Sequence, residues 1–204
     1  ATRRRLLNAA ETEFGTRGYH GASVSSITQR AEIAQGTFYL YFRSKEELYF
    51  AICVRALRKL REIFLAVAAA APSGYEQILA IGRAYATFAD DWPGYFDALS
   101  HLEAHQPGEA APDSIEREAL EAGKAVHSVT IAALEKGRSD GSLRADLGDP
   151  LLTALSLWAF SHGMVQLART KRHFLADVGV DVDQRRLPER RAATGGANGS
   201  RPEP

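Results

Sequence analysis

The sequence predicts an all-α protein. Apolar residues recur at the 3.6-residue spacing of amphipathic helices along most of the chain, as in Leu6, Ala10 and Phe14. Prolines and glycines interrupt this spacing at intervals that suit helix lengths. No stretch combines alternating apolar and polar residues with turn signals well enough to indicate a strand. The content of 45% hydrophobic and 25% charged residues is ordinary for a globular chain that buries a core.

The N-terminal part of the chain predicts three helices. The apolar spacing that begins at Leu6 ends at the glycines of TRGYHG. Ser23 has the position of an N-cap for a helix over VSSITQRA, whose inward face includes Ile27. A break over residues 32–34 separates this helix from a third one in QGTFYLYF. We therefore expect two short helices, joined by a tight turn, after the first.

Longer helices are expected in the rest of the chain. Ser44 caps a helix in RSKEEL, with Glu47 placed as in a capping box, and the apolar series from Leu48 carries this helix to about Ala71. Further helices are expected over about 73–91, 93–105, 113–138 and 149–170, and HFLADVG predicts a short last one. From about Val182 the chain is polar and rich in glycine and proline, which predicts disorder.

The charges of the chain are unevenly divided, although its formal net charge is zero. Residues 1–61 contain eleven Lys and Arg against five Asp and Glu, or +6. Residues 62–204 contain fourteen against twenty, or −6. A basic segment on an acidic body favours a polyanion as the partner of the basic part. Solvated helix faces produce such divisions as well, so the charge alone does not identify the partner.

The two short helices predict a helix-turn-helix at residues 24–42. In this motif the second helix enters the major groove of DNA with its first turn against the base edges. Gln35 and Thr37 occupy that turn; Gln pairs with adenine, and Thr offers a hydroxyl or a methyl group to thymine. Gly36 lies between them and, without a side chain, allows the backbone to approach the groove closely.

The aromatic residues that follow divide by helical phase. Phe38 and Phe42 are four residues apart and predict a buried face, whereas Tyr39 and Tyr41 point elsewhere and can reach phosphate oxygens. Lys45, at the start of the next helix, adds a cation near the positive end of the helix dipole. The alternative is a plain helical hairpin with tyrosines half-buried at its edge.

Residues 3–48 resemble the N-terminal DNA-binding domain of the TetR/AcrR family of bacterial transcriptional regulators. The family pattern is found in LLNAAETEFGTRGYHGASVSSIT, in QGTFYLYF and in SKEEL. The resemblance implies an all-α homodimer that binds a palindromic operator, usually as a repressor that a small ligand releases. It implies an N-terminal three-helix helix-turn-helix DNA-binding domain, followed by a C-terminal helical ligand-binding and dimerisation bundle.

The resemblance also implies DNA contacts at particular residues. The groove-facing positions of the family correspond to Gln35, Gly36, Thr37 and Tyr39. Its phosphate contacts correspond to Tyr41 and Lys45, and residues that touch backbone or base correspond to Ser23 and Ser25. Leu40 matches a position that can approach DNA, where a leucine offers only apolar contact.

The chain departs from the family pattern at three places. Glu32 stands in the turn where glycine is common, so this residue either adopts a positive φ, at a cost of about 1 kcal/mol, or reshapes the turn. Thr28 replaces a small apolar residue. The family ends in two long helices that form the dimer interface, whereas here the charged, glycine- and proline-rich tail follows helix 149–170. The alternatives are a dimer that depends on this helix and on HFLADVG, a weaker dimer, or one with a different arrangement.

We expect three regions: a DNA-binding domain at 1–48, a ligand-binding and dimerisation domain at 49–178, and a disordered tail at 179–204. A pocket between bundle helices needs an apolar wall with a few polar groups. The candidates are Phe88, Trp92, Tyr95, Phe96, His101, His127, Trp158 and His162. Taken singly, each residue also suits the core or an interface. A ligand in this bundle would shift helix 49–71 and thereby change the spacing of the two recognition helices.

An alternative function is a helical metal-binding sensor or a metal-dependent enzyme. His101 and His105 are four residues apart on a predicted helix and could share a divalent metal, with His127 or Asp97 as a third ligand. The chain has no G-x-S-x-G, P-loop or G-x-G-x-x-G motif. We therefore expect no enzyme and no cofactor. Another alternative is a ligand-binding module whose head no longer binds DNA.

Cys53 is the only cysteine, which excludes an internal disulfide and favours a reducing, cytoplasmic location. Its apolar neighbours predict a buried, inert thiol. The N-terminus lacks the apolar core of a signal peptide, and we expect no segment that spans a membrane. The expected partners are double-stranded operator DNA, an unidentified small ligand and a second copy of the chain.

Overall fold

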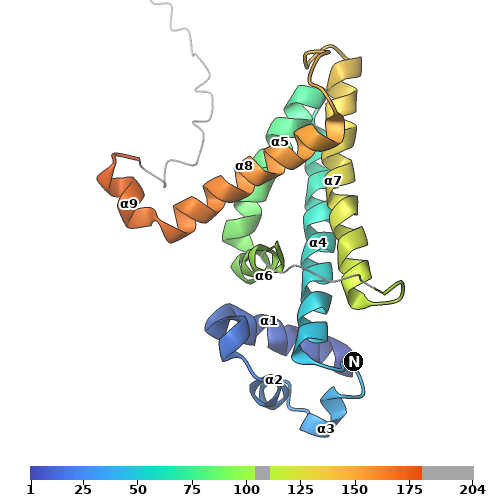
Figure 1. Cartoon of the computed structure of the whole chain (residues 1–204), viewed down its shortest axis with the longest axis vertical. Helices are drawn as coiled ribbons and strands as arrows, with labels where there is room; N and C mark the ends of the chain where they lie inside the picture. The colour runs from blue at the N-terminus through green and yellow to red at the C-terminus, as the bar shows by residue number, and fades with distance from the viewer. Residues whose placement is uncertain (104–110, 181–204) are drawn as a thin grey trace, which may run out of the picture. The chain divides into compact units, whose positions relative to one another are not determined.

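The computed structural model describes residues 1–103 and 111–180, and this part of the chain is helical without any strand (Figure 1). The helices are α1 Thr2–Gly21, α2 Val24–Arg30, α3 Gln35–Phe38, α4 Lys45–Ala70, α5 Gly74–Asp91, α6 Pro93–Glu103, α7 Ile115–Ser139, α8 Pro150–Thr170 and α9 Arg172–Asp177. The chain divides into two compact units, Ala1–Gly163 and Met164–Pro204. The predicted all-α class is confirmed, and the expected disordered tail lies almost wholly outside the described residues.

Serine side chains begin several of these helices. Ser23, Ser44, Ser73 and Ser114 each accept a hydrogen bond from an amide in the first turn of α2, α4, α5 and α7. The expected capping box at α4 differs in one detail: Glu47 Oε2 accepts from the amide of Arg43, one residue before the cap, at 2.5 Å. The carboxylate still satisfies an amide just outside the helix.

Helices α1, α2 and α3 pack together around a small apolar core. Leu6 and Ala10 of α1, Ile27 of α2 and Phe38 of α3 are buried, and α2 contacts both α1 and α3. The glycines predicted to end α1 instead bend it: Gly18 has φ 68°, and the helical hydrogen bonding resumes as far as Gly21. Glycine reaches this left-handed backbone region without a steric penalty.

Helix α4 starts beside α1 and runs on between α5 and α7 (Figure 1). Its inner face buries an apolar series from Leu48 to Phe64. The predicted domain boundary at 48/49 therefore falls inside one uninterrupted helix. Cys53 is fully buried on this face, and burial raises the pKa of its thiol to about 12, which fits the predicted inert thiol.

The start of α5 is fixed against the end of α7 by two glycines. A β-carbon on Gly74 would come within 2.0 Å of the Gly137 amide nitrogen, so only glycine permits this approach. Asp140 Oδ2 accepts a hydrogen bond from the Gly74 amide at 2.9 Å, and Lys136 donates to the carbonyl of Pro72 at 2.5 Å. The turn between α4 and α5 is thereby tied to α7.

Helix α8 exposes much of its apolar surface. Leu151, Leu152, Leu157 and Phe160 are exposed, whereas Ala154 is buried. By length and composition alone, α8 would suffice to cross a membrane, and only 17% of its most apolar window is buried. The expectation that no segment has this length and apolarity is therefore corrected for α8. The same exposure is what an interface between subunits would present.

Candidate nucleic-acid interface

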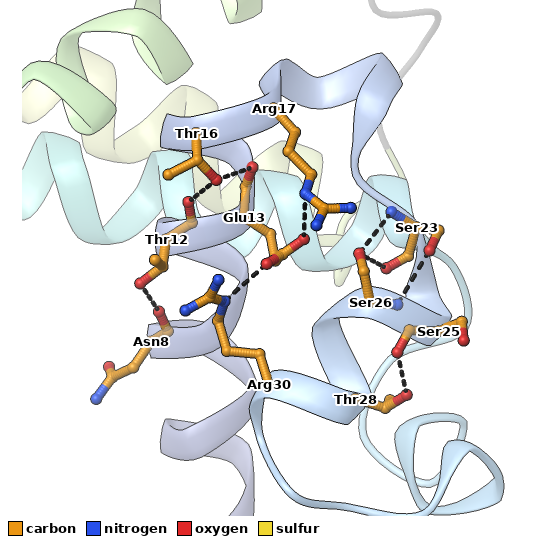
Figure 2. Close-up of polar contacts among 10 residues, drawn as sticks. All are labelled: Asn8, Thr12, Glu13, Thr16, Arg17, Ser23, Ser25, Ser26, Thr28 and Arg30. Carbon is orange, nitrogen blue, oxygen red and sulfur yellow. Dashed lines mark hydrogen bonds and ion pairs between the residues drawn. The ribbon is translucent and has the colours of Figure 1, made fainter.

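Helices α2 and α3 and the turn between them have the arrangement of a helix-turn-helix. Ser23 Oγ accepts from the Ser26 amide at 3.0 Å, and Ser26 Oγ accepts from the Ser23 amide at 3.1 Å (Figure 2). This reciprocal pair satisfies amides that the first turn of a helix leaves open. The start of α2 is therefore held in one conformation.

The aromatic residues at the end of α3 and directly after it divide into a buried and an exposed pair. Phe38 and Phe42 are 0% and 2% exposed, and their ring centroids lie 5.8 Å apart. Tyr39 and Tyr41 are 56% and 42% exposed. The predicted division is confirmed, so the alternative with half-buried tyrosines does not fit. The phenylalanines anchor α3 from inside, and the tyrosines remain accessible to a partner.

The first turn of α3 presents a small polar surface. Gln35 and Gly36 are exposed, and Thr37 is half-buried. A β-carbon on Gly36 would meet nothing within 4 Å, so packing inside the chain does not require glycine there. Its missing side chain leaves the backbone of α3 accessible there, and the predicted close approach of DNA stays a prediction.

Ser23 and Ser25, at the start of α2, are exposed, whereas Ser26 is half-buried. The Ser25 carbonyl accepts a hydrogen bond from Thr28 Oγ1 at 3.1 Å (Figure 2). The Val24 carbonyl accepts from the same hydroxyl at 2.9 Å. Thr28 is 3% exposed, and these bonds satisfy its hydroxyl inside the helix. The replacement of a small apolar residue by Thr28 is thereby accommodated.

Lys45 makes contacts inside the domain. Its ammonium donates to the carbonyls of Tyr19 and Ala22, at 2.8 Å and 2.9 Å, and lies 4.3 Å from the centroid of the Tyr19 ring. These contacts tie the end of α1 to the start of α4. An ammonium has three donors, and two are used here. The contact of Lys45 with a phosphate stays a prediction, and it would have to share the side chain with this internal role.

Glu32 adopts a positive φ of 52°, the strained one of the two backbone alternatives for the turn. Arg5 of α1 donates to the Ala31 carbonyl at 2.5 Å and to the Glu32 carbonyl at 3.2 Å. The same guanidinium lies 3.4 Å from the Glu32 carboxylate. Arg5 therefore holds the turn and offsets the negative charge that Glu32 brings to this surface.

Glu13 is a buried ionic group that the sequence analysis missed. Its carboxylate is 3% exposed, accepts from Arg30 Nε of α2 at 2.7 Å and lies 3.4 Å from Arg17 Nε (Figure 2). The hydrogen bond from Arg30 holds the pKa of Glu13 below its ordinary value. The oxygen Oε2 is buried without a hydrogen bond. The only sequence signal is a carboxylate on the apolar face of α1, and its partner lies seventeen residues away.

Four of the residues predicted to bind a ligand meet in one aromatic cluster within Ala1–Gly163. The His162 ring stacks on Phe96 at 5.2 Å and lies 5.9 Å from Trp158, which lies 5.5 Å from His127. The hydroxyl of Tyr85, which the sequence analysis did not include, lies 2.7 Å from His162 Nδ1. Burial lowers the pKa values of His127 and His162. The cluster combines an apolar wall with two imidazoles whose pKa values burial lowers.

The other predicted ligand residues lie elsewhere. Phe88 is a core residue with 1% exposure, and Tyr95 stacks between it and Trp92, at 6.5 Å and 5.6 Å. His101 lies beside His20 and Tyr49, with ring centroids 5.6 Å and 5.9 Å away. The structure therefore does not bring the eight predicted residues to one place.

The metal alternative finds no support in the described part of the chain. Residues 1–103 and 111–180 contain no group of three or more His, Cys, Asp or Glu side chains that could hold a metal ion. His105 lies outside these residues, so the predicted pair of His101 and His105 stays untested.

A cavity of about 420 Å³ lies between α1, α4, α6 and the start of α7. Its lining residues are Arg3, Leu7, Ala51, Val54, Arg55, Arg58, Lys59, Glu62, Trp92, Tyr95, Ile115 and Glu118. Only Trp92 and Tyr95 belong to the predicted ligand set. The other lining residues could not be grouped from the sequence, because they come from four elements far apart in the chain.

Comparison with protein families gives two matches that cover most of the chain. Residues 6–52 match a model described as bacterial regulatory proteins, tetR family. Residues 78–190 match a model described as tetracyclin repressor-like, C-terminal domain. The second match covers more than half of the chain, and the first contains the helix-turn-helix.

Individual proteins are similar over part or most of the chain. The uncharacterized HTH-type transcriptional regulator YdgC of Bacillus subtilis is 45% identical over 67 residues, which are 31% of this chain and 34% of YdgC. The chain thus covers about a third of the length of this relative. The structure of FadR from Bacillus subtilis in complex with stearoyl-CoA has a TM-score of 0.68 at 18% identity, covering 88% of this chain and 90% of FadR. AibR in complex with isovaleryl coenzyme A and operator DNA has a TM-score of 0.65 at 20% identity, covering 81% and 86%.

Proposed function

Because the chain belongs to the TetR family of bacterial transcriptional regulators, we propose that it is a ligand-responsive repressor that binds a palindromic operator as a homodimer. The observation that carries this proposal is the exposed first turn of α3, held from inside by Phe38 and Phe42. A rigid short helix with small polar residues at its start suits the major groove of DNA. The +6 charge of residues 1–61 favours the same polyanion.

The contacts divide by chemistry. Gln35 and Thr37 would read base edges, and Gly36 would allow the backbone of α3 to come close. Tyr39 and Tyr41 would donate hydrogen bonds to phosphates, together with Ser23, Ser25 and Lys45. Phosphate contacts position the domain without reading sequence, so specificity would depend mainly on the first turn of α3.

The dimer would form through α8. Leu152 and Phe160 are 65% and 70% exposed, which leaves a substantial apolar surface in contact with water in a single chain. A second copy packed on this surface would remove that cost and place two α3 helices on one face of the DNA. Operator half-sites would then lie about 34–36 Å apart, one turn of the double helix.

The ligand response would depend on the bundle around α4. This helix runs from Lys45 to Ala70, so a shift of its bundle part would move the DNA-binding part as well. The cluster of Phe96, His127, Trp158 and His162 is the proposed site for an apolar ligand. FadR and AibR have bound acyl-coenzyme A molecules in their structures, so acyl thioesters are the first ligand class to test.

The test of this function is selection of bound duplexes from a random DNA pool, with parallel low-salt and moderate-salt washes. An enriched inverted repeat that survives the moderate-salt wash is expected. A chain that retains only salt-sensitive binding, without an enriched sequence, would contradict operator recognition, because phosphate contacts alone are strongly salt-dependent.

A further inference from the structure

We propose that the cavity between α1, α4, α6 and α7 binds a small organic anion, which competes with Glu11 for the guanidinium of Arg55. This site differs from the aromatic cluster proposed above for an apolar ligand. Its volume of about 420 Å³ is within the range of small-molecule sites. The binding part of the inference is independent of the proposed function, and its effect on DNA rests on that function.

The charges of the lining favour an anion. Four cationic side chains, from Arg3, Arg55, Arg58 and Lys59, line the cavity, against two carboxylates, from Glu62 and Glu118. The cations come from α1 and from successive turns of α4, so they surround the space from two elements. Grouped cations beside a low-dielectric wall raise the local concentration of anions.

The rest of the lining is apolar and sets the second requirement for the ligand. Leu7, Ala51 and Val54 line the cavity but are 5%, 6% and 3% exposed, so most of the accessible apolar surface comes from the half-buried Ile115 and from Trp92, which is 41% exposed. A hydrated inorganic ion would leave this surface in water. The chemical class that matches both parts is an oxyanion, phosphate or carboxylate, on a small apolar or aromatic body.

The ion pairs at the rim are of the kind that a ligand can replace. Arg58 pairs with Glu118 at 2.6 Å, but the two side chains are 65% and 43% exposed. Lys59 lies 4.0 Å from Glu62, and the Glu62 side chain is 70% exposed. Exposed pairs of this type contribute little stability, so at Arg58 and Lys59 the exchange of a carboxylate for a ligand oxyanion costs little. The side chains of Arg55 and Glu11 are 31% and 25% exposed, so a ligand must replace that contact with an equivalent bond.

The contacts of Glu11 connect the cavity to the DNA-binding part of the chain. Arg55 of α4 donates to Glu11 Oε1 of α1 at 2.6 Å and to Asn8 Oδ1 at 2.8 Å. The hydroxyl of Tyr95 of α6 donates to the same Glu11 oxygen at 3.0 Å. One carboxylate thus joins the DNA-binding part of the chain to α4 and α6, and two of its partners line the cavity.

An anion in the cavity would therefore loosen this joint. A ligand oxygen that accepts from Arg55 takes a donor that now serves Glu11, and α1 loses a contact with α4. A ligand shifts such an equilibrium only by its differential affinity for the two states. Here the ligand binds more weakly while Arg55 is paired with Glu11, because the guanidinium is already in use, and more tightly once that pair is broken.

The test of binding uses Trp92 as the reporter. Trp92 and Trp158 are the only tryptophans, so the variant Trp158→Phe isolates the residue in the cavity. In this background, titration with phenyl phosphate should change Trp92 fluorescence saturably, with a Kd below about 1 mM. A second titration with isophthalate tests whether a carboxylate binds in place of a phosphate. Benzyl alcohol is the uncharged control.

Matched variants locate the effect. Arg58→Gln should weaken phenyl phosphate binding about tenfold, the loss expected for a hydrogen bond between charged groups. Arg61→Gln removes an exposed arginine of the same helix that does not line the cavity, and binding should stay unchanged. Any of three results would refute the site. The fluorescence change could fail to saturate with both anions, benzyl alcohol could bind as tightly as phenyl phosphate, or Arg58→Gln and Arg61→Gln could weaken binding equally.

The coupling is tested separately with operator DNA. Glu11→Gln should weaken operator binding without any ligand, and phenyl phosphate should have less effect on this variant than on the natural chain. If phenyl phosphate binds saturably but operator affinity does not change, the competition with Glu11 is refuted and the anion site itself is retained. A chain that binds no operator would contradict the proposed function, while the fluorescence titration would still decide the site.

Discussion

Glu32 and Arg5 illustrate how single residues determine the turn before α3. The φ of 52° at Glu32 lies in the left-handed region, where an L residue with a β-carbon is strained by about 1 kcal/mol. Three contacts from Arg5 hold the strained turn: two with backbone carbonyls and one with the carboxylate. The strained residue lies next to the first turn of α3, which is proposed to contact DNA. A different turn conformation would change the orientation of α3.

We expect Glu32→Gly to raise the free energy of unfolding by about 0.5 kcal/mol. The free energy gained by relieving the strained φ should exceed two losses. One is the exposed ion pair with Arg5, and the other is the greater conformational entropy that glycine gives the unfolded chain. Glu32→Ala is the matched control: it removes the carboxylate but keeps the β-carbon, so it should be slightly destabilising. Urea unfolding of both variants measures this, and equal effects would contradict the strain.

Arg30 and Glu13 should respond differently to replacement. Arg30→Met should lower the free energy of unfolding by about 3 kcal/mol, because it leaves a buried carboxylate without its main partner. Glu13→Met should cost less than about 1 kcal/mol, because it removes the buried charge and leaves two arginines that are partly exposed.

The same pair predicts a pH dependence. The pKa of Glu13 lies below 4.5 in the folded chain, so the pair stabilises fully above that pH. Its contribution is lost as the pH falls through the lowered pKa, and Glu13→Met should remove this part of the acid sensitivity. Urea midpoints measured across this range test it; an unchanged acid profile in Glu13→Met would place the sensitivity elsewhere.

Helix α3 is too short to be stable alone and depends on the buried rings of Phe38, its last residue, and Phe42, which follows it. Thr37→Ala and Tyr39→Ala alter only its outer face, so each should weaken operator binding by about 1–3 kcal/mol without changing the fold. Binding isotherms with the selected operator measure the loss, and circular dichroism checks the fold. Operator binding equal to that of the natural chain in both variants would refute the recognition surface.

Helix α8 should carry the dimer. Leu152→Glu places a charge on its exposed apolar surface and should convert a dimer to a monomer, because a buried unpaired charge costs several kcal/mol. Leu65→Glu is the control, since Leu65 is also an exposed leucine but lies on α4. Analytical ultracentrifugation of both variants distinguishes them. An unchanged dimer in Leu152→Glu would move the interface away from α8.

The whole molecule should lose stability as the pH falls below neutrality. Burial lowers the pKa values of His127 and His162 below 6.5, so the unfolded chain binds more protons between the lowered values and 6.5. Stability therefore falls as the pH drops through this range. Replacing both histidines by glutamine should flatten the change, as measured by melting temperatures at about pH 7.5 and about pH 5.5. An equal slope in this double variant would exclude these imidazoles as the cause.

The charge division also acts at the scale of the molecule. The positive charge of residues 1–61 and the negative charge of residues 62–204 sum to zero, but they lie in different parts of the chain. Such a chain presents its basic part to a polyanion and repels it from the rest, which favours one orientation on DNA.

Local signals allowed most of the helices to be predicted. Serine caps, prolines and glycines depend on residues within one turn, so the bounds of α4 to α8 agree with expectation to within about two residues, the usual uncertainty of helix ends. The spacing of Phe38 and Phe42 likewise predicted which rings are buried. Although α3 ends at Phe38, the amide of Phe42 still donates to the Phe38 carbonyl at 3.0 Å, which keeps the two rings on one side.

The sequence by itself determined most of the helices and the place of the turn before α3, because backbone sterics and periodicity act over a few residues. It did not determine the end of α3, which is at Phe38 and not at the end of QGTFYLYF, or the conformation of Glu32. Only the tertiary structure decided which distant side chains meet. It paired Glu13 with Arg30, turned Lys45 inward to the end of α1, and placed Trp92 and Tyr95 beside the cations of α4 rather than with His162. These contacts depend on how helices cross, and the packing of the whole core sets that geometry.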